Sequence, residues 1–328
     1  MTAPPPAGPL LSAASPGEPP AAAEAEPTAA AEPGLGRRAL ASLRRDPVAL
    51  IAVLLVIALA LVAVFAPLLA PYDPLKAYSN GLSADGAPVS PGSAFLLGTD
   101  PNGRDVLSRM IFGARVSLLV GVVATGLASL IGVLVGGIAG YAGGITDSVL
   151  SRFMDVMFAF PSLVFMIALT ALVPDSLPRV LVVVAVIAVF GWTAIARVVR
   201  GQTLSLVNRE FVLAARSLGA DWRWILFREL LPNLASTVIV FASLSVPAAV
   251  GTEAALSFLG VGIPPPAPDL GRSISDAIVW VQADPMFLLF PAGLLFAAVL
   301  GFNLFGDGLR DALDPRTDRM VWTGRPGR

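Results

Sequence analysis

The first long apolar run, Val48–Ala70, most restricts what this chain can fold into. It contains no charged residue, and fifteen of its side chains are Leu, Ile, Val or Phe. Each of these favours insertion by about 0.3–0.6 kcal/mol at the centre of a membrane helix, so the run inserts readily. Lipid offers no partner for backbone N–H and C=O groups, and a helix pairs them within the segment. The run therefore predicts a membrane-spanning helix.

Five further uncharged runs approach the length needed to cross a hydrocarbon core of about 30 Å. They cover Val116–Tyr141, Val156–Val173, Val180–Ala196, Asn233–Thr252 and Pro285–Phe305. Pro161 is expected to kink the third run near one end, because proline removes a helical hydrogen bond. The sequence thus predicts an all-α membrane protein with six transmembrane helices.

The residue types that are missing exclude several kinds of site. The chain has no Cys and no His, which argues against a zinc, haem or iron–sulfur centre. Its single lysine, Lys76, is not in a Walker A loop, which needs G-x-x-x-x-G-K-[ST]. We therefore expect no enzyme activity and no bound cofactor, and any ATP that drives this protein is hydrolysed by another chain. We expect membrane lipid to surround the protein, and we expect no nucleic-acid partner.

Basic residues predict the orientation. With the N-terminus inside, sixteen of the 22 Lys and Arg residues fall in cytoplasmic segments, which places both termini in the cytoplasm by the positive-inside rule. Residues 1–36 are rich in Ala, Pro and Glu and are expected to be disordered. The predicted organisation continues with a basic flank and first helix (37–70), an extracytoplasmic loop with an amphipathic segment (71–115), a five-helix core (116–306) and a cytoplasmic tail (307–328).

Between the fourth and fifth runs lies a polar island, Val198–Pro232, which holds five arginines and much helical periodicity. Two amphipathic patterns meet at Gly219, which suits the left-handed residue that ends a helix. Asp221 is placed to cap the second pattern. A long cytoplasmic loop of this kind either lies on lipid headgroups or docks a cytoplasmic partner.

The island resembles the EAA loop of ABC importer permeases, through Ala214, Ala215, Gly219 and the pair Leu231–Pro232. In that family the loop forms a coupling helix that sits in a groove of the ATPase subunit. Two positions depart from the pattern, since Leu213 replaces the glutamate and Glu229 replaces an isoleucine. The residues assigned to ATPase coupling by this resemblance are Glu210, Ala214, Ala215, Arg216, Gly219, Asp221, Leu231 and Pro232.

A second segment, Gly98–Gly121, precedes and enters the second run. From its residues alone it predicts an interfacial helix that leads into the membrane. It also closely resembles the GTDxxGRDxxSR…GxRxSL signature of the dipeptide/oligopeptide/nickel permease family, in its second or "C"-type permease. Arg152–Pro161, Glu253–Gly262 and Asn303–Pro315 agree with the same family. The signature positions are Gly98, Thr99, Asp100, Gly103, Arg104, Asp105, Ser108, Arg109, Gly113 and Arg115.

The resemblance implies a type I ABC importer permease of the inner membrane. Its implied partners are a second homologous permease, two cytoplasmic ATPase subunits or domains, and an extracytoplasmic solute-binding protein. Its implied cargo is a peptide, nickel or a related solute. An ion-coupled secondary transporter is the alternative, although such proteins use intramembrane carboxylates that the run centres lack. A membrane enzyme would need nucleophile and base pairs, which are not apparent here.

Two further features of the runs are candidates for mechanism. Small residues recur every fourth position in the second run and predict close helix packing, within the chain or on a second permease. They are Ala124, Ala128, Gly132, Gly136 and Gly140. Glu253, placed near the outer end of the fifth run, is a pathway or gate candidate or an interfacial residue. Pro161 is the second gate candidate.

Overall fold

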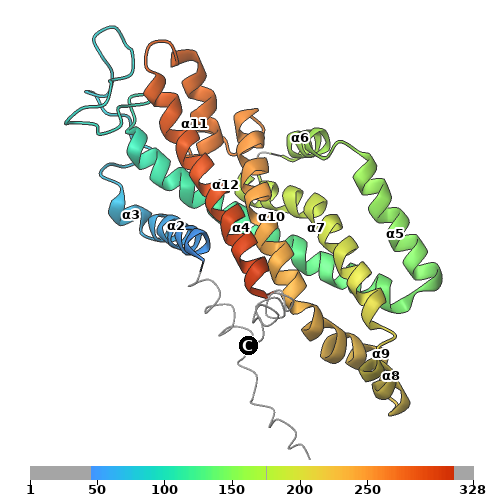
Figure 1. The fold of residues 1–328 in the computed structure, drawn as a ribbon. Helices are drawn as coiled ribbons and strands as arrows, with labels where there is room; N and C mark the ends of the chain where they lie inside the picture. The colour runs from blue at the N-terminus through green and yellow to red at the C-terminus, as the bar shows by residue number, and fades with distance from the viewer. Residues whose placement is uncertain (1–45, 175, 314–328) are drawn as a thin grey trace, which may run out of the picture. The chain divides into compact units, whose positions relative to one another are not determined.

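The computed structural model describes residues 46–174 and 176–313. The chain divides into two units, Met1–Gly34 and Leu35–Arg328, and the described residues belong to the second. The predicted disordered segment 1–36, the basic residues up to 45 and the tail from 314 lie outside them. Within the described residues every regular element is helical (Figure 1).

The elements are α2 (Pro47–Val64), α3 (Ala66–Leu69), α4 (Val106–Ala142), α5 (Gly144–Ala159), α6 (Ser162–Leu172), α7 (Arg179–Leu206), α8 (Glu210–Ser217), α9 (Trp222–Trp224), the π-helix η1 (Ile225–Leu230), α10 (Leu231–Phe258), α11 (Leu270–Ala277), the 3₁₀ turn η2 (Ile278–Trp280) and α12 (Pro285–Leu313).

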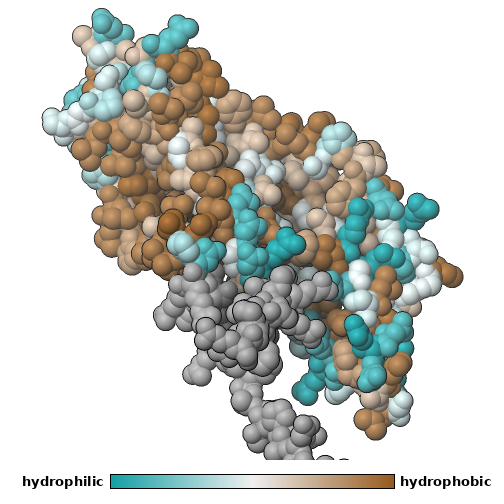
Figure 2. All heavy atoms as spheres, viewed as in Figure 1, coloured by the Kyte–Doolittle hydropathy of each residue, from teal (hydrophilic) through white to brown (hydrophobic). Residues whose placement is uncertain are grey.

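Five of the described helical segments are long and apolar enough to cross a membrane. They are Pro47–Val64, Val106–Ala142, Arg179–Leu206, Trp222–Phe258 and Pro285–Leu313. The pair α5 and α6 makes a sixth candidate if it is taken as one span. Apolar residues cover much of the face shown in Figure 2, and polar residues gather over the loops and helix ends.

The third predicted run differs most from the structure. The single kinked helix expected over Val156–Val173 is wrong, because α5 and α6 are separate helices bent by 86°. Pro161 lies at the break and precedes the first residue of α6. Its missing N–H and fixed φ explain why α5 does not continue through this point. The two helices pack on α7 as two arms of a bent unit.

The first run is divided at Phe65 into α2 and α3 and ends at Leu69, whereas the remaining four extend beyond their predicted bounds. The second begins at Val106 rather than Val116, so the signature segment and the apolar run form one helix. The fourth continues to Leu206, and the fifth runs on to Phe258. The added turns lie at the ends of the bundle and contain polar residues. An apolar run therefore stops before the helix does.

The small-residue stripe on α4 packs on α7 of the same chain. A methyl group at Gly132 would lie 2.8 Å from the Trp192 carbonyl oxygen, and one at Gly140 would lie 2.8 Å from that of Arg200. At Gly136 it would overlap the Ala196 carbonyl. Ala124 and Ala128 continue the buried face. The stripe therefore lets the two backbones approach closely, where packing replaces the hydrophobic drive that lipid removes.

Gly136→Ala is expected to destabilise the protein by about 1–3 kcal/mol, since the obstructing atoms are backbone and cannot turn aside. Gly126→Ala is the matched control on the same helix, because no described atom lies within 4 Å of the added carbon. Thermal unfolding of the two purified variants checks this. Equal midpoints would show that the α4–α7 contact tolerates the methyl group.

Candidate functional site

Helices α8 and α9 project beyond the bundle at what we call the loop end, and α11 lies at the opposite or far end (Figure 1). Gly219 joins the two helices at φ +85°, a left-handed conformation that glycine adopts without steric cost. Asp221 caps α9 as the sequence predicts, accepting a hydrogen bond from the Trp224 N–H at 2.9 Å. The island is thus a helix–turn–helix element.

One face of α8 is fastened to the bundle. Val212 and Ala215 are buried against Ile225, Leu226 and Leu230 of η1. The cluster is sealed by partly buried side chains from neighbouring segments, which are Tyr141, Leu206 and Ala220. The packing makes α8 and η1 a connected unit.

Two polar contacts reinforce the loop end. The Arg216 guanidinium of α8 lies 5.2 Å from the centre of the Tyr141 ring on α4, within cation–π range. Arg200 of α7 forms a bidentate pair with Asp147 of α5, in which Nη2 lies 2.7 Å from Oδ2. Glu210 opens α8 and lies in its first turn, where a negative charge suits the helix dipole.

The exposed surface of the loop, which we call the apolar face, carries large apolar side chains interspersed with charged ones. The large apolar side chains are Phe211, Leu213, Leu218, Trp222, Trp224 and Phe227. Leu218, next to Gly219, is 89% exposed. A shallow hollow there is lined by Ala215, Leu218, Gly219, Ala220, Asp221 and Trp224. An exposed apolar patch with a polar rim marks an interaction surface.

The loop is joined to the membrane helix α10 without a break. Helical residues run from Trp222 to Phe258, and the only change is the π-helical turn η1, in which the Leu231 N–H bonds to the Leu226 carbonyl. Leu231 and Pro232 form the first turn of α10, and Pro232 has no N–H to donate there. The second half of the loop and α10 therefore form one continuous helical segment.

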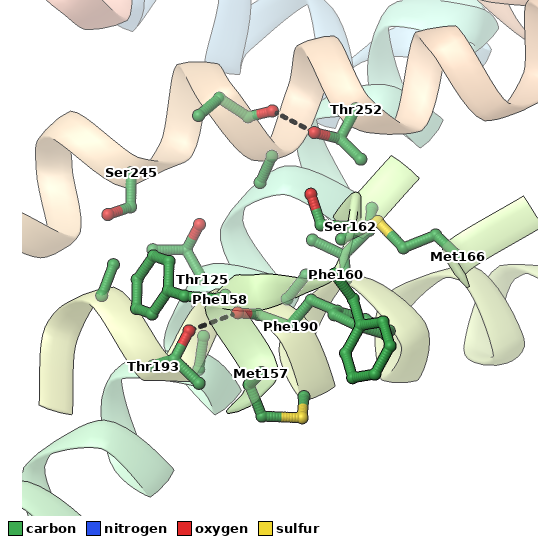
Figure 3. Close-up of a pocket in the computed structure, with 17 residues that line it drawn as sticks. Thr125, Met157, Phe158, Phe160, Ser162, Met166, Phe190, Thr193, Ser245 and Thr252 are labelled. Atoms are coloured by element: carbon green, nitrogen blue, oxygen red, sulfur yellow. Dashed lines mark hydrogen bonds between the residues drawn. The ribbon is translucent and has the colours of Figure 1, made fainter. Parts of the chain in front are cut away.

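A cavity of about 280 Å³ opens between α4, α7, α10 and the bend of α5 and α6. Figure 3 shows Phe158, Phe160 and Phe190 beside it, together with the hydroxyls of Ser162 and Thr193. Further polar lining comes from Thr125, Ser245 and Thr252. Among the described residues, no charged side chain lines it. Pro161 and Glu253, the two gate candidates, are not in the lining, although their neighbours are.

Most hydroxyl groups of the cavity donate a hydrogen bond to a backbone carbonyl of their own helix. Thr193 donates to the Phe190 carbonyl at 2.9 Å and Thr252 to the Ala248 carbonyl at 2.8 Å (Figure 3). The Ser245 hydroxyl likewise donates to the Phe241 carbonyl at 2.7 Å. Their lone pairs remain available to a solute, while Thr125 Oγ1 has no partner among the described residues. The cavity thus offers weak, uncharged polar contacts on an apolar wall.

The signature segment builds a hydrogen-bonded cap at the far end. The Arg109 guanidinium is almost fully buried, lies 3.3 Å from the Asp100 carboxylate and donates to the Pro74 and Pro266 carbonyls at 3.2 Å. Asp100 also accepts from the Arg104 N–H at 2.9 Å. Arg109 therefore ties α4 to the loop after α3 and to the loop before α11.

Other signature residues fix the local backbone. Asp105 caps α4 and accepts from the Ser108 N–H and hydroxyl at 2.8 and 2.6 Å. The Thr99 hydroxyl is buried and donates to the Gly81 carbonyl. Gly98 and Gly103 have φ of +76° and +73°. Gly113 lets α4 approach the start of α11, while Arg115 is exposed and Arg104 half-buried.

Comparison with known proteins decides the family. Residues 132–319, which include most of the cavity lining and the whole polar island, match the family of binding-protein-dependent transport system inner membrane components. The chain belongs to this family. Residues 34–85 also match the N-terminal TM domain of oligopeptide transport permease C. The expected resemblance is therefore confirmed, and this permease is a multi-pass protein of the cell membrane.

Named relatives align along most of their length. The oligopeptide transport system permease protein OppC of Bacillus subtilis is 39% identical over 86% of this permease and 90% of the relative. The glutathione transport system permease protein GsiD of Pectobacterium atrosepticum is 41% identical over 83% and 88%. The dipeptide transport system permease protein DppC of Alkalihalophilus pseudofirmus is 38% identical over 85% and 90%.

Two parts of the site were not found by reading the sequence of the permease. The hydroxyls of the cavity come from four separate segments, and no local spacing brings Thr125, Thr193 and Ser245 together. Asp269 caps α11 by accepting from the Arg272 N–H at 2.8 Å, and it meets Glu253. Asp269 lies directly before Leu270–Ala277 and after a proline-rich loop. An aspartate at such a position is a helix-start signal from which its capping role could have been predicted.

Proposed function

We propose that this permease is one of two homologous membrane subunits that together form the pathway of an ATP-driven peptide importer. The single observation that carries the proposal is the loop end, where an apolar docking face is built on a helix that continues into α10. In this proposal the ATPase subunit binds α8 and the Gly219 turn. Closure of the ATPase pair then moves α10 and changes the cavity from inward-facing to outward-facing.

The docking role uses the residues that the EAA resemblance assigned. Ala215 faces the bundle, so its small side chain sets how closely α8 lies on η1. Ala214 and Gly219 are exposed and leave room for a partner's surface. Leu213, which replaces the glutamate of the pattern, is exposed too, so the contact there is apolar rather than ionic.

The cavity is proposed to be this chain's share of the translocation pathway. Its volume of about 280 Å³ lies below the usual range of about 300–1,000 Å³ for small-molecule pockets. A second permease subunit would complete it. The bent pair α5–α6, with one arm on either side of Pro161, would form the third of six spans in this arrangement.

Peptides are the proposed cargo because the relatives are named for oligopeptide, dipeptide and glutathione transport. An uncharged wall with hydroxyl groups suits peptides of varied side chains, since it neither attracts nor repels a particular charge. A solute-binding protein would deliver the peptide to the far end. We also propose that the loop end and both termini face the cytoplasm, as the distribution of Arg predicts.

ATP would be bound and hydrolysed entirely by the partner subunits, because this chain has no Lys-bearing phosphate loop. No cofactor or metal is assigned to it.

Ala248→Trp is expected to block uptake in the assembled transporter, because Ala248 lines the cavity and is exposed there. An indole at this position would fill much of the available volume. The assay is ATP-dependent peptide uptake into proteoliposomes that contain both permeases and the ATPases, with the binding protein added. The Ala248→Ser variant, which adds little volume, should transport normally.

Undiminished uptake by the Ala248→Trp transporter, with normal assembly, would show that the cargo does not pass this cavity. Uptake that needed neither ATP nor the binding protein would contradict the importer proposal itself.

A further inference from the structure

Two buried carboxyl groups meet at the far end of the molecule. Glu253 lies on α10 and Asp269 lies directly before α11, and the side chains of both are sealed from solvent at 0% exposure. The Glu253 carboxyl interacts with Asp269 and with Ser117 of α4. Ser257 Oγ donates to Glu253 Oε1 at 3.2 Å. The cluster therefore joins three helices through Glu253.

Each of the two carboxyl groups has one oxygen without a hydrogen-bond donor. Glu253 Oε2 and Asp269 Oδ2 are both buried, and neither finds a donor among the described residues. Two ionised carboxylates can only accept, and in contact inside a protein they repel strongly. One proton between the two oxygens would satisfy both and would remove the repulsion. The Ser117 hydroxyl, which interacts with Glu253, is also buried and forms no hydrogen bond with the described residues.

The surroundings decide which residue holds the proton. Asp269 Oδ1 already accepts from the Arg272 N–H at 2.8 Å, at the positive end of α11. Arg109 of α4 acts on Asp269 as an attractive charge. Glu253 lies in the body of α10 among serine hydroxyls and has no such support, so the proton belongs on Glu253.

Other charged residues of the packed elements have different partners or lie elsewhere, and Arg115 of α4 is exposed. Arg272 forms an ion pair with Asp276 at 3.0 Å. Arg179, at the start of α7, donates to the Thr170 carbonyl at 2.9 Å. In the described part of α12 the charged residues lie at the opposite end of the helix, and they are Asp307, Arg310 and Asp311.

We propose that Glu253 binds a proton that it shares with Asp269, and that this shared proton clamps the end of α10 to the start of α11. The helices are close enough for a clamp, since a methyl group at Gly271 would overlap the Ala254 carbonyl. Because α10 continues into the loop end, the clamp makes α11 follow any displacement of α10. Deprotonation would open it.

Infrared difference spectroscopy on the assembled transporter in lipid nanodiscs tests the proton directly. The wild-type spectrum minus that of Glu253→Gln should show the C=O stretch of a protonated carboxylic acid, above the amide band. In Asp269→Asn this band should persist but shift, because Glu253 then donates to a neutral amide. The Asn variant keeps the cap of α11, since asparagine is also a good N-cap residue.

No protonated-acid band in the difference spectrum would overturn the proposal, as would an equivalent of bound metal lost with Glu253→Gln. This spectroscopic test is independent of the proposed function. Failure of the importer proposal would instead show as wild-type transporter without uptake.

The clamp itself is tested by uptake, which does rest on the proposed function. Glu253→Gln keeps a neutral donor for Asp269 and an acceptor for Ser257, so uptake should stay near wild type. Glu253→Leu removes both and leaves Asp269 unpaired, so uptake should fall roughly tenfold or more at equal membrane level. Equal uptake by the two variants would show that no clamp operates. If the Leu variant does not assemble, the spectra of Glu253→Gln and Asp269→Asn decide.

Discussion

Gly219→Asp is expected to reduce peptide uptake by at least about thirtyfold while the protein remains folded in the membrane. The side chain would enter the exposed apolar face that we assign to the ATPase, and an unpaired charge in an interface costs about 2–5 kcal/mol. No described atom lies within 4 Å of the new Cβ, and aspartate tolerates a positive φ better than most residues. Uptake and membrane level are measured together.

Gly86→Asp is the matched control, because Gly86 also has a positive φ, of +75°, and also has no described atom near its Cβ position. It lies in the loop between α3 and α4, far along the chain from the polar island. This variant should transport normally. Normal uptake by Gly219→Asp would remove the loop from the coupling mechanism, and a loss in both variants would indicate backbone strain instead.

Arg109→Met is expected to destabilise the permease by about 3–5 kcal/mol, the usual cost of removing one partner from a buried ion pair. Asp100 would keep its bonds from backbone N–H groups but lose its cation, and the Pro74 and Pro266 carbonyls would lose a donor. Denaturant or thermal unfolding of the purified chain measures the change.

The double variant Arg109→Met with Asp100→Asn should recover part of that loss, because no buried charge is then left unpaired. Arg115→Met, on the same helix but exposed, should change stability by less than about 0.5 kcal/mol. Equal stability of the Arg109 and Arg115 variants would mean that the cap at the far end does not depend on the ion pair.

Local signals in the sequence predicted the loop end well. A left-handed Gly219 and the cap formed by Asp221 follow from the backbone preferences of those residue types, and the structure has both. The stripe from Ala124 to Gly140 predicted a close helix contact because its period is that of one helix face. Within the chain its partner is α7.

Features that depend on distant contacts were not predictable in this way. Pro161 predicts a bend in any helix, but the 86° break between α5 and α6 depends on what each helix packs against. Glu253 is fully buried inside the protein, which its place near the end of an apolar run did not predict. Its partner, Asp269, lies beyond a loop and on another helix, and hydropathy carries no information on that encounter.

Site-specific cross-linking tests most directly whether the ATPase binds at the loop end. The chain contains no cysteine, so Leu218→Cys adds a single thiol on the most exposed part of the apolar face. In the assembled transporter we predict a cross-link from this thiol to the ATPase subunit, and none from Ser93→Cys, an exposed position of the loop between α3 and α4. A cross-link to the ATPase from Ser93→Cys but not from Leu218→Cys would contradict the account.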